Sequence, residues 1–343
     1  MSEVSPYMAL GMQLTCHAIN KCASREEVMK KMEKRIDEID FQIFSAIKFL
    51  GKDLKLIVVP EYFLTSYPGK ESIQQWREKA CLKKDGNIMS KLGALCKKHG
   101  VFLSGNYYEQ DDNFPEIFFQ SSFILDDLGE LILNYRRLNS MYSPTPFDVY
   151  DRYIELYGYE ALFPVVDTKL GRLACIASEE ILYPEVARCL MMRGAEVFLH
   201  SSSEIGSALP TKKNIAKKAR AIENMAYVVS ANSAGITDIG ILKNSTDGHS
   251  QIVHYEGHPL AEASDGESIV ANSWIHIDAQ RHYRSVVSMK NYIARQRFGL
   301  YAKSYADHEH YPSNVFAEGK KQKSKFHLEQ IKTIEKLKNK EII

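Results

Sequence analysis

Short apolar runs alternate with amphipathic stretches along most of this 343-residue chain, and this alternation constrains its fold more than any other feature. Strand-like runs lie at 56–60, 101–108, 121–125, 131–135, 172–177, 196–201, 226–231 and 250–254. Helical patterns lie near 25–49, 88–99, 183–193 and 211–225. Such alternation, with hairpin-like stretches between the elements, predicts an α/β fold with mixed sheets. The sequence has no internal repeat, and a chain of this length can bury a large core.

The segment from Gly171 to Arg193 predicts a buried strand that leads through a sharp turn into a helix. Open α/β sheets bind ligands at the carboxyl ends of their strands, and the residue exposed at this strand end is Ser178. Cys175 lies three residues earlier on the strand, so its side chain points to the opposite face. We expect Cys175 to be a small buried apolar residue.

Several other segments accompany this junction in a fixed order. Glu61 follows the apolar run 56–60, and Arg137 follows the run 131–135 within the tripeptide Tyr135-Arg136-Arg137. The segment 218–232 predicts a helix that leads into a strand, and the segment 248–262 contains a further strand-like run.

Together these segments resemble the nitrilase superfamily of carbon–nitrogen hydrolases, in its amidase-like branch, from about residue 8 to residue 285. The segment 248–262 resembles a hairpin of that family. The resemblance implies a four-layer αββα sandwich and a catalytic glutamate, lysine and cysteine. The glutamate falls on Glu61, but Arg137 occupies the lysine position and Ser178 the cysteine position, six residues before Pro184. We expect a single domain over 1–290, followed by an extension at 291–343 that contacts a second copy or is solvated.

The two replacements weaken the chemistry that the family uses. A glutamate is a poor base for a serine hydroxyl, which is a far weaker acid than a thiol. An arginine keeps the positive charge of a lysine but does not release a proton at ordinary pH. Aliphatic amidases also carry a second glutamate, and Thr145 occupies that position here.

Three explanations therefore stay open. The chain is an enzyme that hydrolyses a small amide, nitrile or carbamoyl compound, an inactive homologue that binds a ligand or a protein partner, or an engineered cysteine-to-serine trap. Exclusive pairing of Arg137 with Glu61 would favour the inactive homologue. Ser178 facing Glu61 at hydrogen-bonding distance would favour the enzyme.

Six further residues are candidates for substrate binding, and some of them have a structural alternative. Glu180 is also interpreted as a structural carboxylate, His200 as a hydrogen-bonded residue at a strand end, and the tyrosine-rich stretch 142–159 as a surface loop. The candidates are Tyr62, Tyr142, Glu179, Glu180, His200 and Ser203.

The composition argues against several other functions. A formal net charge of +1 without a basic patch does not suit nucleic-acid binding. No apolar run is long enough to span a membrane, and the amino terminus lacks the features of a signal peptide. Six cysteines without disulfide or zinc spacing indicate a cytoplasmic protein with no metal site. We expect no cofactor, and by resemblance a homodimer or larger homo-oligomer that associates through residues 184–193 and the carboxy-terminal segment.

Overall fold

The computed structural model describes residues 3–204, 207, 209–243, 248–319 and 321–343. Within these ranges the strands are β1 (Tyr7–Gly11), β2 (Cys16–His17), β3 (Leu54–Val58), β4 (Phe102–Glu109), β5 (Phe119–Leu125), β6 (Leu131–Arg136), β7 (Val166–Thr168), β8 (Gly171–Ala177), β9 (Val197–Ser201), β10 (Tyr227–Ala231), β11 (Ile236–Thr237), β12 (Gln251–Val253), β13 (Pro259–Glu262) and β14 (Asn272–Ile275). The α-helices are α1 (Arg25–Leu50), α2 (Ile73–Ala80), α3 (Asn87–His99), α4 (Tyr150–Tyr157), α5 (Pro184–Met192), α6 (Lys212–Asn224), α7 (Ile277–Ser285), α8 (Phe298–Asp307) and α9 (Ser324–Asn339). A short 3₁₀ helix, η3 (Ser178–Leu182), connects β8 to α5.

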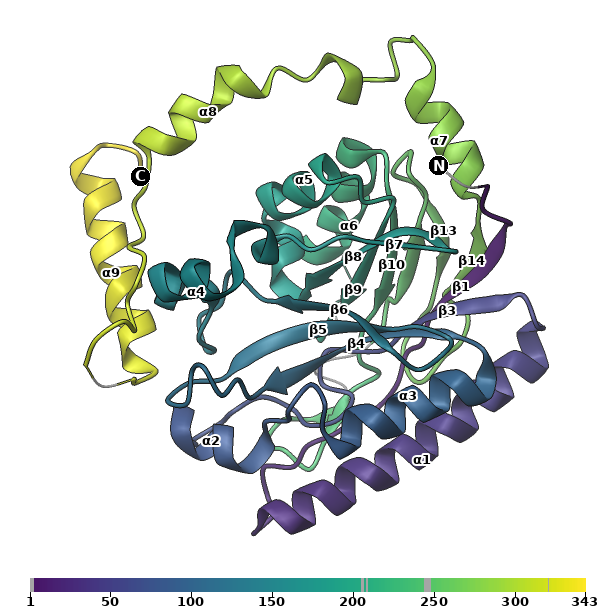
Figure 1. Ribbon diagram of the computed structural model, residues 1–343, viewed down its shortest axis with the longest axis horizontal. Coiled ribbons are helices and arrows are strands. Elements are labelled where there is room, and N and C mark those ends of the chain that lie inside the picture. The colour runs from purple at the N-terminus through teal and green to yellow at the C-terminus, as the bar shows by residue number, and fades with distance from the viewer. Residues whose placement is uncertain (1–2, 205–206, 208, 244–247, 320) are drawn as a thin grey trace.

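Over the described residues, two six-stranded sheets lie face to face, in the orders β14-β1-β3-β4-β5-β6 and β13-β12-β10-β9-β8-β7. Helices α1 and α3 cover the outer face of the first sheet, and α5 and α6 cover that of the second (Figure 1). Neighbours β1, β3 and β4 are parallel, as are β8, β9 and β10, whereas the outer strands pair antiparallel. The predicted four-layer αββα sandwich is therefore confirmed.

Helix α1 illustrates how the sequence forms the outer layer. Ser24 caps its start by accepting a hydrogen bond from the backbone of Glu27, and Gly51 ends it with a φ of 99°. Apolar residues at three- and four-residue spacing, among them Ile36, Ile39 and Ile43, form one buried face. This face packs against the first sheet in one continuous core.

A second core fills the space between the sheets and extends under α5 and α6. Leu56 and Val58 of β3 are buried there with Ala174 and Ile176 of β8. The sheets approach closely at Gly11, where a β-carbon would lie 2.4 Å from the carbonyl oxygen of Ser230. Only a glycine lets β1 cross β10 at this distance.

The carboxy-terminal segment runs from α7 past α8 to α9, around the outside of the sandwich (Figure 1). It is not solvated throughout, because Phe316 and Phe326 are buried and their ring centroids lie 5.1 Å apart. Both residues join the core of the first sheet. The domain boundary at residue 290 stays a prediction. Among the helices of the described ranges, none combines the length and the apolar character that crossing a membrane requires.

Candidate active site

Ser178 lies where β8 ends and η3 begins, and its backbone has an unusual conformation. Its φ is 47°, in the left-handed region that a serine enters only when the surrounding structure holds it there. Pro184 then occupies the first turn of α5, where its missing N–H leaves no hydrogen bond unmade. The predicted strand–turn–helix is thus present, and Ser178 is 96% buried, with a relative exposure of 4%.

His200, at the end of β9, holds the backbone of this turn. Its Nε2 lies 2.8 Å from the Ser178 carbonyl oxygen, and its Nδ1 lies 2.9 Å from the Ser230 hydroxyl. A carbonyl oxygen can only accept, so Nε2 carries the proton and Nδ1 accepts from the Ser230 hydroxyl. Burial, followed by the charge of Lys217, lowers the pKa of His200 well below its usual value. His200 is therefore a neutral positioning residue beneath Ser178.

Glu61 and Arg137 come from the first sheet and meet in the buried interior. Glu61 Oε1 accepts hydrogen bonds from Gln120 Nε2 at 2.7 Å and from Arg137 Nη1 at 3.3 Å. Arg137 Nη1 also donates to Gln120 Oε1 at 2.8 Å. Gln120 lies on β5, beside the end of β6 that positions Arg137, and sequence analysis did not single it out.

Arg137 forms a second ion pair with Glu179, through Nη2 and Oε1. Its Nε donates to the backbone carbonyl of Asn139 at 2.7 Å, so described residues engage four of its five N–H donors. Burial disfavours this charge, but the carboxylates of Glu179 and Glu61 outweigh burial and raise the pKa of Arg137 further. Arg137 is a fixed positive charge.

Glu180 supports the backbone that follows Arg137. Its fully buried carboxylate accepts from the Tyr135 hydroxyl at 2.7 Å and from the backbone N–H groups of Leu138 and Asn139 at 2.8 and 2.9 Å. Burial raises the pKa of Glu180, although Arg137 and these hydrogen bonds oppose the rise. This geometry matches the structural alternative for Glu180, because protein groups occupy both carboxylate oxygens.

Lys213, near the start of α6, is the site residue that sequence analysis missed. Its Nζ lies 3.2 Å from Ser178 Oγ and 3.2 Å from Ser202 Oγ. Burial lowers the pKa of Lys213, although the carboxylates of Glu61 and Glu204 oppose this effect. The sequence analysis considered an exclusive Arg137–Glu61 pair or a Ser178–Glu61 hydrogen bond, and the described residues show neither. Arg137 forms ion pairs with both Glu61 and Glu179, and the Ser178 hydroxyl is hydrogen-bonded to Lys213.

The residue pattern of α6 gave no signal for this lysine. Lys213 and Lys217 share the buried face of the helix, whereas Ile215 and Ile222 are 61% and 45% exposed. A surface helix normally places its lysines outward and its isoleucines inward. Apolar spacing alone would therefore have placed Ile215 and Ile222 inward and both lysines outward, and only the packing of α6 shows the reverse.

The remaining predicted residues lie at different distances from Ser178. Tyr62 is half-buried beside the site, and burial followed by the charge of Glu61 raises the pKa of its hydroxyl well above the usual value. The Ser203 hydroxyl lies 2.9 Å from the Ser233 hydroxyl. The preceding residue, Ser202, is hydrogen-bonded to Lys213 instead. Tyr142 is 65% exposed, and the structure does not bring it to the others.

Cys175 is buried between the sheets, as expected from its position on β8. Its sulfur lies 3.7 Å from Ser104 Oγ, and burial raises the pKa of the thiol to about 12. The thiolate that a nucleophile requires is therefore strongly disfavoured at this position.

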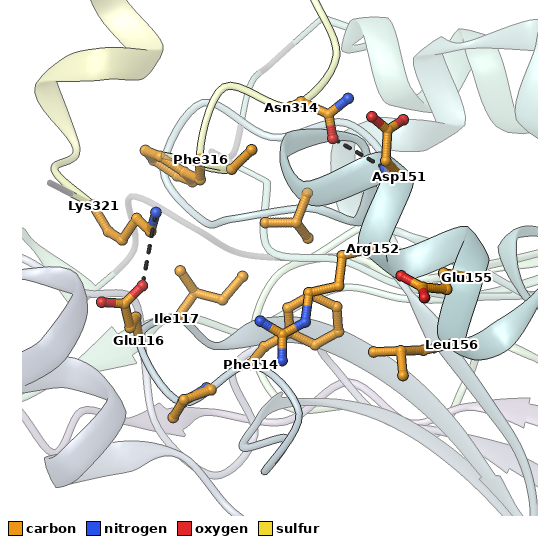
Figure 2. Close-up of a pocket in the computed structure, with 13 residues that line it drawn as sticks. Phe114, Glu116, Ile117, Asp151, Arg152, Glu155, Leu156, Asn314, Phe316 and Lys321 are labelled. Atoms are coloured by element: carbon orange, nitrogen blue, oxygen red, sulfur yellow. Dashed lines mark hydrogen bonds and ion pairs between the residues drawn. The ribbon is translucent and has the colours of Figure 1, made fainter. Parts of the chain in front are cut away.

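The carboxy-terminal segment lines several cavities, of which two lie near α4 or Glu179. One of about 330 Å³ is lined by Glu179 and Asn139 together with Tyr311 and Phe326 of that segment. A larger cavity of about 790 Å³ lies between α4 and a part of the segment that includes Asn314, Phe316 and Lys321 (Figure 2). None of its lining residues is Glu61, Arg137, Ser178 or Lys213. The smaller cavity is the one that adjoins the predicted site.

The pattern of the carbon–nitrogen hydrolases matches residues 10–278, which is more than half of the chain. An omega-amidase of Saccharomyces cerevisiae is 25% identical over 259 residues, which cover 73% of this chain and 83% of that protein. A deaminated glutathione amidase of Yersinia enterocolitica is 25% identical over 197 residues, which cover 57% of this chain and 67% of that protein.

A similar fold is found in the crystal structure of Nit3 from Saccharomyces cerevisiae, a member of branch 10 of the nitrilase superfamily. The TM-score is 0.64 at 20% sequence identity, and the match covers 84% of this chain and 98% of that one. At this identity, the likeness establishes the fold alone.

Proposed function

Because this chain belongs to the carbon–nitrogen hydrolase family, we propose that it hydrolyses a small non-peptide amide, nitrile or carbamoyl compound, with Ser178 as its nucleophile. The observation that carries this proposal is the conformation of Ser178, which sits at a strand end in a left-handed backbone with a basic group against its hydroxyl. Strained residues of this kind cluster at active sites. Relatives named as amidases support the substrate class.

The reaction would proceed through an ester on Ser178. The hydroxyl oxygen attacks the carbonyl carbon, its proton goes to a base, and the carbon–nitrogen bond breaks as the nitrogen takes up a proton. Water then attacks the ester, releases the carboxylic acid and restores the hydroxyl. Arg137 supplies fixed positive charge near the reacting centre, and Glu179 and Tyr62 are proposed to contact the substrate.

One observation favours a second candidate function, a homologue that binds without turnover. Glu61 Oε1 accepts hydrogen bonds from Gln120 and Arg137, and within the described residues no hydrogen bond joins Glu61, the base position in the family, to Ser178. A single engineered replacement is less consistent with the structure, because Arg137 is integrated with Glu61, Gln120 and Glu179. Cytoplasmic location and homo-oligomerisation stay predictions.

Ammonia release from a panel of small amides, nitriles and carbamoyl compounds tests the proposal. Wild-type protein would be assayed beside Ser178→Ala and Ser178→Cys. Activity that the alanine variant loses by about a thousandfold or more would support Ser178 as the nucleophile. Activity in the cysteine variant alone would point to a competent site that lacks only its thiol. Inactivity of all three proteins would favour the binding homologue.

A further inference from the structure

We propose that Lys213 is the catalytic base that takes the proton from the Ser178 hydroxyl, so that the two residues form a serine–lysine pair. This inference rests on the proposed function, since it assigns a role within the same site. It replaces the base expected from the family resemblance, Glu61, with a residue from a different element, α6.

The geometry permits proton transfer in the expected direction. As an ammonium group, Lys213 Nζ donates to the hydroxyl oxygens of Ser178 and Ser202, each at 3.2 Å. After losing one proton, the amine still donates to Ser202, and its lone pair can accept from Ser178 across the same distance. The Ser202 contact thereby keeps Nζ in place in both protonation states. Lys213 is nearly fully buried, which limits competition from water.

Glu61, unlike Lys213, makes no hydrogen bond with Ser178 in the part of the chain that the structure describes. Its Oε1 already accepts from Gln120 and Arg137. A carboxylate is also a much weaker base than an amine, and a serine hydroxyl requires a stronger base than a thiol does. A neutral lysine is the stronger base, provided that its surroundings favour loss of the proton.

The charged groups around Lys213 oppose one another. The carboxylates of Glu61, Glu179 and Glu204 favour the ammonium form, whereas Arg137 disfavours it. Lys217, one turn along α6, adds a second nearby amine, and His200 below Ser178 is neutral. Within the described residues no carboxylate oxygen lies within 4.0 Å of Lys213 Nζ, in contrast to Arg137. Burial therefore dominates and lowers the pKa of Lys213 from 10.5.

Each proton can be followed through the cycle. Neutral Lys213 accepts the Ser178 proton as the bond from Oγ to the carbonyl carbon forms, and the resulting ammonium donates a proton to the departing nitrogen. In the second half, the amine accepts a proton from the attacking water and returns one to Ser178 Oγ as the ester bond breaks. Lys213 finishes neutral, and the net reaction consumes one water.

A fluorophosphonate probe measures the first step independently of the natural substrate. Ser178 Oγ forms a bond to phosphorus, fluoride leaves, and the hydroxyl proton passes to the base. Peptide mass mapping locates the adduct, and labelling rates are compared between about pH 7 and pH 10. The variants are Lys213→Met, Lys213→Arg and Ser178→Ala. Lys212→Met is the matched control, because Lys212 is the neighbouring lysine and is exposed.

We expect labelling of wild-type Ser178 at a rate that rises with pH and levels off below the ordinary lysine pKa. Lys213→Met and Lys213→Arg should each slow labelling by about a hundredfold or more, because neither new side chain accepts a proton. Lys212→Met should label at the wild-type rate, and Ser178→Ala should not be labelled. Circular dichroism confirms folding, and Lys213→Gln replaces any variant that unfolds.

Two failures are distinguishable. Wild-type labelling at Ser178 that persists at an unchanged rate in both Lys213 variants would overturn the role of Lys213 and leave the proposed function standing. Absence of a Ser178 adduct in wild-type protein over the whole pH range would overturn the proposed function and this inference together.

Discussion

The two buried basic residues of the candidate site, Arg137 and Lys213, differ in what surrounds them. Arg137, which follows β6 in the first sheet, is held by the carboxylates of Glu61 and Glu179. Lys213, on the helix that covers the second sheet, is bonded to the hydroxyls of Ser178 and Ser202. Both side chains are buried, so the difference comes from their partners and not from their exposure.

Because of this difference, Arg137 keeps its positive charge, whereas Lys213 can lose its proton more easily. The carboxylates beside Arg137 offset the cost of burying its charge, and the pKa of Arg137 rises. The hydroxyls beside Lys213 do not offset the cost of burying an ammonium group, and the pKa of Lys213 falls. In the nitrilase superfamily a lysine supplies the fixed charge. Here an arginine holds that position, and a lysine from another element is poised to exchange a proton.

Removing the fixed charge should have the largest effect. Arg137→Met leaves the buried Glu61 carboxylate without its cation, and should lower the free energy of unfolding by about 3–5 kcal/mol. Lys213→Met removes a buried amine that has no carboxylate oxygen in hydrogen-bonding contact within the described residues, and should be neutral or stabilising by up to about 1 kcal/mol. Urea denaturation of both variants measures the difference. Equal destabilisation would contradict the distinction between the two cations.

The relative loss of activity in Lys213 and Glu61 variants tests which of the two residues is the base. Lys213→Met should lower kcat/KM by about a hundredfold or more, as expected for loss of a general base. Glu61→Gln should lower it by about tenfold, the loss of one charge contact worth about 1.4 kcal/mol. Steady-state kinetics on the substrate found in the panel gives both values. A larger loss in Glu61→Gln would return the role of base to Glu61.

A third buried basic residue, Lys217, should make the free energy of unfolding depend on pH. Burial lowers its pKa to about 8, so above that pH the unfolded chain binds more protons than the folded one. Stability should therefore rise between pH 8 and about 9.5, by at most about 1.4 kcal/mol per pH unit for this residue. At higher pH buried tyrosines such as Tyr135, whose pKa is raised by burial, act in the opposite direction.

The measurement is the free energy of unfolding of wild type and Lys217→Met at each pH. The difference between the two proteins should carry the slope, because every other titrating group is shared. Parallel curves would show that Lys217 keeps an ordinary pKa in the folded protein.

The smallest effect is expected at the partly exposed end of the Arg137 network. The Glu179 side chain is 34% exposed, so Glu179→Gln should destabilise by no more than about 1 kcal/mol. If Glu179 also contacts substrate beside the adjoining cavity, KM should rise while kcat changes little. A loss confined to kcat would argue that Glu179 acts through Arg137 on the chemical step.

Local pattern predicted the principal elements well, because each is a continuous run with its own signal. The helix predicted at 25–49 is α1 at Arg25–Leu50, and the strand predicted at 131–135 is β6 at Leu131–Arg136. The short β1 and β14 were not predicted. Five and four residues give little periodicity, and their pairing joins chain segments that are more than 260 residues apart.

The sequence by itself determined the layered α/β fold, the strand end that presents Ser178, and the positions of Glu61 and Arg137. Only the tertiary structure decided which groups these residues meet. Packing of α6 against the second sheet brings Lys213 to the Ser178 hydroxyl, and pairing of β5 with β6 places Gln120 between Glu61 and Arg137. The physical reason is that partners distant in the chain are chosen by how whole elements pack, whereas local spacing reports only the face on which a residue lies.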